Sequence, residues 1–228
     1  MKVLARSRTT KTVLITAVLL GFLTLPSAAA PTPTVTSVSV ARTVTIFGQV
    51  GSFARQTARP NSARKPIYLT FDDGPYPTQT KKLLAILKRY SVRATFFVLG
   101  VQARKAPGVV RAERAAGHAI GNHTWDHRDL ARVSSAGIRD ELVKGGRAIR
   151  DASGVTPRCM RPPYGSTNGR VRTVNQRLHL RQVLWSVDTN DWQLPSVNTL
   201  TSRILSARPG QIVLMHDGGG NRSRTLAA

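Results

Sequence analysis

From about residue 65 onward, short apolar runs alternate with amphipathic stretches. Runs rich in β-branched and aromatic residues predict strands at 67–71, 94–99, 158–161, 182–187 and 211–215. Between them, apolar residues recur at helical spacing and predict helices near 78–90, 107–117, 135–152, 168–176 and 197–207. This alternation predicts an α/β fold with a parallel sheet or barrel. In such folds, active sites gather at the carboxyl ends of the strands.

The first 64 residues differ in character from the rest. Residues 1–29 have the order of a secretory signal peptide: four basic residues, an apolar stretch at 13–25, and small residues at 27–30. An uncleaved membrane anchor is the alternative, although this apolar stretch is short for a membrane span. Residues 30–64 are rich in Pro, Thr and Arg and are predicted to form a linker, with or without a strand of its own. We therefore expect a secreted protein whose globular domain covers residues 65–228.

The chain is strongly basic, with 34 Lys and Arg against 11 Asp and Glu and a net charge of +23. Removal of the four basic residues of the leader would leave +19. Such a charge favours polyanionic surroundings, and for an exported protein an anionic cell wall or lipid surface fits better than nucleic acid. Compositional drift is an equal alternative, because arginine is spread along the whole chain. A monomer is the favoured oligomeric state.

Cys159 is the only cysteine, which excludes an intrachain disulfide. It lies in a predicted strand and is interpreted as a small core residue rather than a nucleophile.

Two adjacent aspartates, Asp72 and Asp73, end the first predicted strand. No Asp or Glu precedes them, and Gly74-Pro75 follows as a turn signal. Neighbouring strand residues point to opposite faces, but at the end of a strand the backbone can direct both carboxylates into one site. Two carboxylates this close repel each other unless a cation lies between them or one of them is protonated. The pair therefore indicates a functional site.

His123 and His127 are four residues apart, within the segment HTWDH. This spacing places both imidazoles on one face of a turn. With one carboxylate they form a common ligand set that leaves coordination positions open for water and substrate. A pair of surface or capping histidines is the alternative for this motif taken alone. The occurrence of the Asp72-Asp73 turn in the same chain makes a metal site the favoured interpretation.

Three further polar segments end predicted strands: RPPYG at 161–165, DTNDW at 188–192 and LMHD at 214–217. Each has a plain structural alternative, namely a rigid proline turn, an Asx turn with a packed aromatic residue, and a histidine satisfied within the core. The arginine of the first segment can form a bidentate pair with a carboxylate. Because all the motifs lie at strand ends, we expect them to share one site.

Taken in order, the five motifs TFDDGP (70–75), HTWDH, RPPYG, DTNDW and LMHD resemble those of the polysaccharide deacetylases, carbohydrate esterase family four. The resemblance covers about residues 65–226 and extends to ATFFVLG (94–100), AGHAIGNHT (116–124) and HDGGGNRSRT (216–225). It implies a distorted (β/α) barrel that hydrolyses N-acetyl groups on amino sugars. It also implies one divalent metal ion, most commonly zinc, with cobalt or manganese as alternatives.

The resemblance assigns the base side of the site residue by residue. Asp73, His123 and His127 would bind the metal. Asp72 would be the general base that acts on water. Arg161 would hold Asp72 in place and favour its ionised form.

The acid side is assigned in the same way. His216 would protonate the leaving amine, oriented and kept basic by Asp191. The backbone N–H of Tyr164 would help to stabilise the oxyanion. The substrate-binding residues would be Trp192, Leu214 and Pro163, of which the first two would wall the acetyl pocket.

The end of the chain departs from the family pattern. Family domains usually continue past the glycine-rich loop with a final helix and strand, whereas this chain ends at Ala228. The resemblance thus implies a barrel that lacks these elements and is open on one side, with exposed apolar surface.

The leading functional hypothesis is an exported, metal-dependent deacetylase of peptidoglycan or a chitin-like polymer. Acetylxylan esterase activity is the alternative within the enzymes, because the same chemistry cleaves an ester. A non-catalytic cell-wall-binding relative is the alternative from another class. The intact Asp72 and His216 argue against it, since a binder needs neither.

Overall fold

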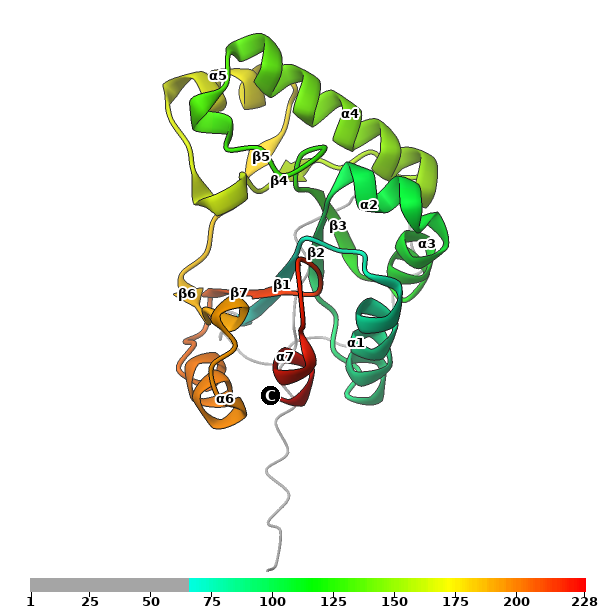
Figure 1. Ribbon diagram of the computed structural model, residues 1–228, viewed down its shortest axis with the longest axis vertical. Helices are drawn as coiled ribbons and strands as arrows, with labels where there is room; N and C mark the ends of the chain where they lie inside the picture. The colour runs from blue at the N-terminus through cyan, green and yellow to red at the C-terminus, as the bar shows by residue number, and fades with distance from the viewer. Residues whose placement is uncertain (1–65) are drawn as a thin grey trace, which may run out of the picture. The chain divides into compact units, whose positions relative to one another are not determined.

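The computed structural model describes residues 66–228, and the predicted signal peptide and linker lie outside the described residues (Figure 1). The strands are β1 (Tyr68–Asp72), β2 (Thr95–Val98), β3 (Ala119–Asn122), β4 (Cys159–Met160), β5 (Arg181–Gln182), β6 (Val187–Asp188) and β7 (Ile212–His216). The α-helices are α1 (Pro77–Arg89), α2 (Gly100–Lys105), α3 (Pro107–Ala115), α4 (Ser135–Ser153), α5 (Gly169–Arg177), α6 (Val197–Leu205) and α7 (Ser223–Ala227). Three short 3₁₀ helices are η1 (Leu130–Arg132), η2 (Pro163–Gly165) and η3 (Asp191–Gln193).

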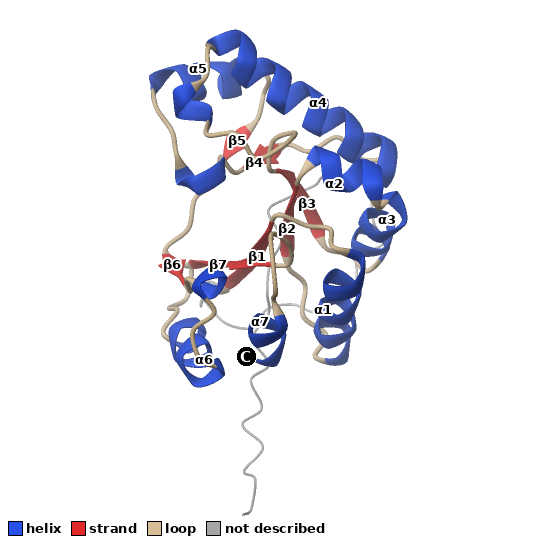
Figure 2. Ribbon diagram, in the orientation of Figure 1, coloured by secondary structure: helices blue, strands red, loops and turns tan. Residues whose placement is uncertain are grey.

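All seven strands belong to one parallel sheet, in the order β5-β4-β3-β2-β1-β7-β6. The sheet is strongly curved, and α1 to α4 follow one another along its outer side (Figure 2). Among the described residues, no strand pairing joins β5 to β6, so the curved sheet stays open between its two edges. The predicted distorted (β/α) barrel is confirmed, in the form of a half-barrel.

The central strands are buried on both faces of the sheet. The outer face is apolar, and the inner face also carries polar side chains. On the outer face, Phe71, Phe96 and Val213 pack in one core with Leu83 and Leu87 of α1. Complete burial of an apolar side chain of this size contributes about 1.5–3 kcal/mol. Side chains alternate along a strand, so the residues next to them in sequence point to the inner face. The register places Thr70 beside Leu214 and Asp72 beside His216, and these four residues line that inner face.

The predicted strand at 182–187 was wrong as a single element. It is divided into β5, which pairs with β4, and β6, which pairs with β7 at the opposite edge of the sheet. The segment between them crosses the open side of the half-barrel. There the carbonyl oxygens of Val183 and Leu184 accept hydrogen bonds from the buried guanidinium of Arg161, at 3.3 and 3.2 Å.

Two elements were not predicted. Residues 119–122 form β3, and α2 precedes the predicted helix at 107, which ends at Ala115. Cys159 lies in β4 and is partly buried, and burial raises the pKa of its thiol to about 11, as suits an unreactive packed residue. Within residues 66–228, no helix is both long enough and apolar enough to cross a membrane.

The Gly145-Gly146 pair, which weakens α4 as an isolated helix, has a packing role. A Cβ at Gly145 would lie 2.7 Å from the side-chain oxygen of Asn122 and 2.7 Å from the carbonyl oxygen of Thr124. Only glycine therefore lets α4 approach so closely to the loop that follows β3. That loop carries both histidines of the HTWDH motif.

Candidate active site

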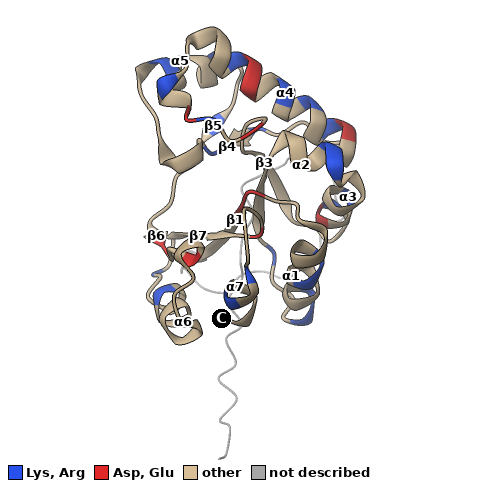
Figure 3. Ribbon diagram, in the orientation of Figure 1, with Lys and Arg blue, Asp and Glu red and all other residues tan. Residues whose placement is uncertain are grey.

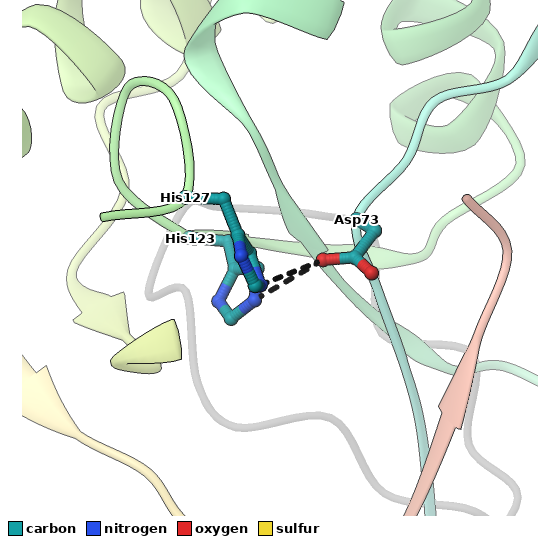
Figure 4. Close-up of side chains that lie close together, drawn as sticks. All are labelled: Asp73, His123 and His127. Atoms are coloured by element: carbon teal, nitrogen blue, oxygen red, sulfur yellow. Dashed lines mark ion pairs between the residues drawn. The ribbon is translucent and has the colours of Figure 1, made fainter. Parts of the chain in front are cut away.

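Three candidate ligand atoms converge at the carboxyl ends of β1 and β3. The Oδ1 atom of Asp73 lies 3.4 Å from Nε2 of His123 and 3.3 Å from Nε2 of His127 (Figure 4). One ligand atom from each residue lies within 4.8 Å of the other two. The structure therefore brings together the two histidines and the aspartate that the sequence analysis assigned to the metal, across fifty residues of chain.

The chemistry of these atoms fits a divalent cation. Nδ1 of His123 lies 2.8 Å from the carbonyl oxygen of Arg161, which can only accept a hydrogen bond. Nδ1 therefore carries the proton in the neutral ring, and Nε2 presents a lone pair to the cluster. The Oδ1 atom of Asp73 is buried and has no hydrogen-bond partner among the described residues. A buried oxygen of this kind needs a partner, and a cation would supply it.

Two carboxylates, those of Asp72 and Asp73, determine the electrostatics of the cluster. Burial opposes ionisation of Asp73, but the adjacent imidazoles of His123 and His127 outweigh it and lower the pKa of the carboxyl to about 2. Burial would also lower the pKa of His123, but the charges of Asp72 and Asp73 overcome it and raise the pKa. Burial and the neighbouring His123 lower the pKa of His127. Two carboxylates thus face two imidazoles, an arrangement that attracts positive charge.

The backbone around the cluster adopts unfavourable conformations. Asp73, Thr124, His127 and Tyr164 have φ values of 73°, 74°, 73° and 61°. Residues other than glycine rarely adopt this left-handed region, at a cost of about 1–3 kcal/mol each. Two of the three residues that contribute candidate ligand atoms, Asp73 and His127, are among them, so the strain lies where ligand direction matters.

Two residues that the sequence analysis did not select hold the histidine loop in place. The buried carboxylate of Glu141 on α4 accepts hydrogen bonds from the backbone N–H groups of Trp125 and Asp126, at 3.0 and 3.2 Å. Asn122 accepts from the backbone N–H of Thr124 at 2.9 Å and donates to a carbonyl on α4 at 2.8 Å. The sequence held one signal for the Glu141 contact, which is an acidic residue within a helix, shortly before the Gly145-Gly146 pair.

Asp72 is held by Arg161, as the sequence analysis expected. The guanidinium donates to Oδ1 of Asp72 at 2.8 Å and to the hydroxyl of Thr70 at 2.8 Å. Arg161 is completely buried and stacks on Phe97, with 4.2 Å from its Cζ to the ring centroid. The other carboxylate oxygen of Asp72 lies 3.8 Å from Nε2 of His123, beside the Asp73–His123–His127 cluster. Thr70, which the sequence analysis missed, lies two residues before Asp72 on the same face of β1.

His216 and Asp191 form a hydrogen-bonded pair on the other side of Asp72. Nδ1 of His216 donates to Oδ1 of Asp191 at 2.6 Å, and the His216 backbone N–H donates to Oδ2 at 2.9 Å. Burial would lower the pKa of His216, but the hydrogen bond and charge of Asp191 outweigh it and raise the pKa. Burial would raise the pKa of Asp191, but the hydrogen bond from His216 prevails and lowers it. Thr225 of α7, a further residue that was missed, donates to Oδ2 of Asp191 at 2.8 Å.

The predicted substrate-binding residues fall into two groups. Tyr164 and Trp192 have exposed side chains, 70% and 54% accessible, and the Tyr164 hydroxyl lies 3.2 Å from Nδ1 of His127. Leu214 and Pro163 are buried, and Leu214 lies two residues before His216 on the same face of β7. Leu214 thus lies beneath His216, where an apolar floor would be, whereas the two aromatic side chains are available at the surface.

Comparisons with known proteins agree on one family. The family model described as polysaccharide deacetylase matches residues 59–183. The chain is 44% identical over 171 residues to a chitooligosaccharide deacetylase of Bradyrhizobium sp. (strain ANU 289), an alignment covering 73% of this chain and 78% of that protein. It is 43% identical over 154 residues to the peptidoglycan-N-acetylglucosamine deacetylase PgdA of Listeria monocytogenes. This second alignment covers 67% of the chain but only 32% of the Listeria protein.

Solved structures show the same relationship. A family 4 carbohydrate esterase from Streptomyces lividans, in complex with acetate, has a TM-score of 0.68 and 36% identity. The match covers 72% of this chain and 83% of that one. A family 4 pseudoenzyme from Bacillus anthracis has a TM-score of 0.67 and 32% identity, with coverage of 72% and 57%. Since the family model matches more than half of the residues and the relatives exceed 40% identity, the chain belongs to the polysaccharide deacetylase family.

Proposed function

We propose that this protein is an exported, metal-dependent hydrolase that removes N-acetyl groups from an amino-sugar polymer and releases acetate. The observation that carries the proposal is the placement of Asp72. It lies beside the Asp73–His123–His127 cluster and next to His216 in the register of β1 and β7. Adjacent strands are about 4.8 Å apart, so a proton acceptor, a cation site and a proton donor fit around one small acyl group.

The proposed cofactor is one divalent ion, most simply zinc, held by Asp73, His123 and His127. When bound, such an ion lowers the pKa of a coordinated water and polarises the acyl oxygen. Asp72 would accept the proton of the attacking water. The Arg161 guanidinium donates a hydrogen bond to Oδ1 of Asp72 and so holds the carboxylate in its orientation.

The departing amine needs a proton, and His216 is placed to donate it. Its Nδ1 proton is committed to Asp191, which leaves Nε2 to carry the proton that is transferred. The raised pKa of His216 favours the protonated ring, which is the form that a general acid requires. The backbone N–H of Tyr164 is the proposed protein donor to the oxyanion. Trp192 and Leu214 would then form the walls of the acetyl pocket.

The proposed substrates are peptidoglycan and chitin-like oligomers, which the names of two relatives at 43–44% identity suggest. Export is proposed from the leader-like order of residues 1–29, and it would bring the protein to such polymers.

The direct test measures acetate release by the purified chain, loaded with zinc or cobalt, from N-acetylglucosamine oligomers and from peptidoglycan fragments. Asp72→Asn is the matched variant, because it keeps the shape of the side chain and removes its charge. We expect it to retain the metal and lose turnover by about 10²–10⁴-fold. Folded, metal-loaded protein that releases no acetate from any of these substrates would refute the proposal. Acetylated xylan in the same assay tests for esterase activity.

A non-catalytic wall-binding role is the second candidate, favoured by the similarity to a family 4 pseudoenzyme. Its signature would be polymer binding that is the same in the wild type and in Asp72→Asn, with no turnover in either. A substrate-dependent acetate signal that disappears in Asp72→Asn would exclude it.

A further inference from the structure

Apart from the candidate active site, the surface has a hollow between α2 and α4, behind the histidine loop. Its volume is about 380 Å³, and we call it the α2–α4 groove. The residues that line it are Ala103, Arg104, Pro107, Trp125, Lys144, Arg147, Ala148, Asp151 and Ala152. Figure 3 shows basic residues along the α4 helix that forms one wall. None of these residues has a role in the proposed deacetylation.

Trp125 holds two of the cations of the groove in place. Cζ of Arg104 lies 4.8 Å from the centroid of its ring and Nζ of Lys144 lies 6.0 Å away, both within range of a cation–π contact. The indole itself is fixed, because it packs against Gly100, where a Cβ would come within 2.6 Å of the ring. A site whose aromatic ring and cations are already held in place is preorganised. The entropic cost of binding a ligand is then smaller, because fewer side chains have to be immobilised.

The positive charge of the groove is not neutralised by the protein. Within residues 66–228, Arg104, Lys144 and Arg147 form no ion pair with an acidic side chain. The one acidic residue of the lining, Asp151, is already paired with Arg150 at 3.1 Å. Lys144 and Arg147 are three residues apart on α4, so they lie on one face of the helix, opposite Arg104. The groove therefore presents cations from both walls to any ligand within it.

We propose that the α2–α4 groove binds a phosphodiester-linked polyol polymer, the anionic component of a cell wall. Phosphate oxygens suit a site with two guanidinium groups and an ammonium group. A hollow between two helices admits a thin flexible chain and is poorly shaped for a flat lipid surface. Two cations already lie against the indole, which makes its ring less available for stacking by the bases of a nucleic acid.

Occupancy of this groove would retain the enzyme beside its substrate. Trp125 lies between His123 and His127 in sequence, so a polymer held in the groove would pass directly behind the metal-binding loop. Attachment to one wall polymer raises the effective concentration of the site toward a neighbouring one. The binding does not depend on turnover, and its failure is therefore separable from failure of the proposed deacetylation.

The test is the affinity of the metal-loaded protein for a synthetic poly(glycerol phosphate) oligomer. The groove variant is Arg104→Gln, Lys144→Gln, Arg147→Gln combined. The control is Lys81→Gln, Lys82→Gln, Lys88→Gln combined, which removes the same charge from exposed positions on α1. We expect the groove variant to bind at least about tenfold more weakly and to show a smaller dependence on salt concentration, and the control to change less than about threefold. Acetate release from a neutral chitooligosaccharide should be unchanged in both.

Three results would overturn the proposal. An equal loss of affinity in both triple variants would show that diffuse charge is responsible. Equal affinity for polyglutamate of the same length would remove the preference for phosphate. Groove-dependent binding to anionic phospholipid vesicles or to single-stranded DNA, without groove-dependent binding to the polymer, would assign the groove to another partner.

Discussion

The proposed metal-binding half of the site lies at the ends of β1 and β3, the proposed acid half lies at the end of β7 and in η3, and the two halves are held in different ways. Asp73 and His127 project from loops in left-handed conformations, and helix α4 supports the histidine loop from outside through Glu141. His216, in contrast, is the last residue of the five-residue strand β7, in ordinary strand register with Asp72. Its orientation comes from a short chain of hydrogen bonds through Asp191 to Thr225.

This difference indicates where each half is vulnerable. The metal half stores backbone strain, and binding of a cation would offset that strain together with the mutual repulsion of the two aspartates. The acid half is unstrained at His216 and depends on a buried charge pair, so pH should affect it first. Substitutions that separate metal content from pH dependence therefore test the comparison.

The largest effect should come from loss of a proposed metal ligand. Asp73→Ala and His127→Ala each remove one of three convergent ligand atoms, so metal content measured by atomic emission should fall from about one ion per chain to near zero. Turnover should fall by about 10³-fold or more, because the ion supplies both water activation and charge stabilisation. Asp126→Ala is the control in the same loop, since its carboxylate pairs with the exposed Arg128 and is not one of the three convergent ligand groups. Full metal content in the ligand variants would contradict the assignment.

Arg161 holds Asp72, which lies between the two halves, and its loss should lower the stability of the protein. Arg161→Met leaves Asp72 buried without its cation, and breaking a buried pair in this way costs about 3–5 kcal/mol. The free energy of unfolding, measured with urea, should fall by that amount. Arg158→Met, three residues before Arg161 and exposed, should change it by less than about 0.5 kcal/mol. Equal stability of the two variants would show that Asp72 does not depend on the guanidinium.

Asp191→Asn should affect the acid half and leave the metal half intact. The charge of Asp191 raises the pKa of His216, and a general acid is active below its pKa, so turnover is lost as pH rises through that value. Without this charge the pKa of His216 falls, and the alkaline limb of the pH–rate profile should move to lower pH. Turnover at neutral pH should fall by about 10²-fold with metal content unchanged. An unmoved alkaline limb would mean that His216 is not the acid.

Thr225→Val should produce a smaller shift in the same direction. Loss of the hydroxyl removes one of the hydrogen bonds that keep Asp191 ionised. We expect a decrease in kcat of up to about tenfold and an alkaline limb at slightly lower pH, with recovery in Thr225→Ser. Thr173→Val on the exposed face of α5 is the matched control, because its hydroxyl donates to the carbonyl oxygen of Gly169 in the same helix. A change in KM alone would contradict the positioning role.

The smallest effect concerns a buried acid outside both halves. Glu113 on α3 is fully buried, and neither of its carboxylate oxygens has a hydrogen-bond partner among the described residues. Burial and the neighbouring Asp217 raise the pKa of Glu113 well above 4.5.

The folded protein therefore keeps a proton on Glu113 that the unfolded chain loses above pH 4.5, and the free energy of unfolding falls as pH rises through this range. Glu113→Leu should raise the free energy of unfolding by about 1 kcal/mol at pH 8 and change it little at pH 4. A gain of the same size at both pH values would show that packing, not ionisation, is responsible.

Much of the fold could be predicted because its central elements are locally encoded. β1, β2 and β7 are apolar runs, and α1 and α4 repeat their apolar residues at helical spacing. The failures lie at the edges of the sheet. The run 182–187 has the composition of one strand, yet its two ends pair with opposite edges. The local sequence pattern does not indicate which neighbouring strand each end of the run will pair with.

The sequence by itself selected the residues that we propose to carry the chemistry. Aspartates and histidines at strand ends are selected by side-chain chemistry and by parallel-sheet geometry, both of which are readable locally. Only the tertiary structure decided how these residues are supported. Thr70 on Arg161, Glu141 beneath the histidine loop and Thr225 on Asp191 are contacts between segments 15 to 91 residues apart. A threonine or a glutamate has the same local signature whether it faces water or supports a buried charge, so such contacts exist only once the chain has folded.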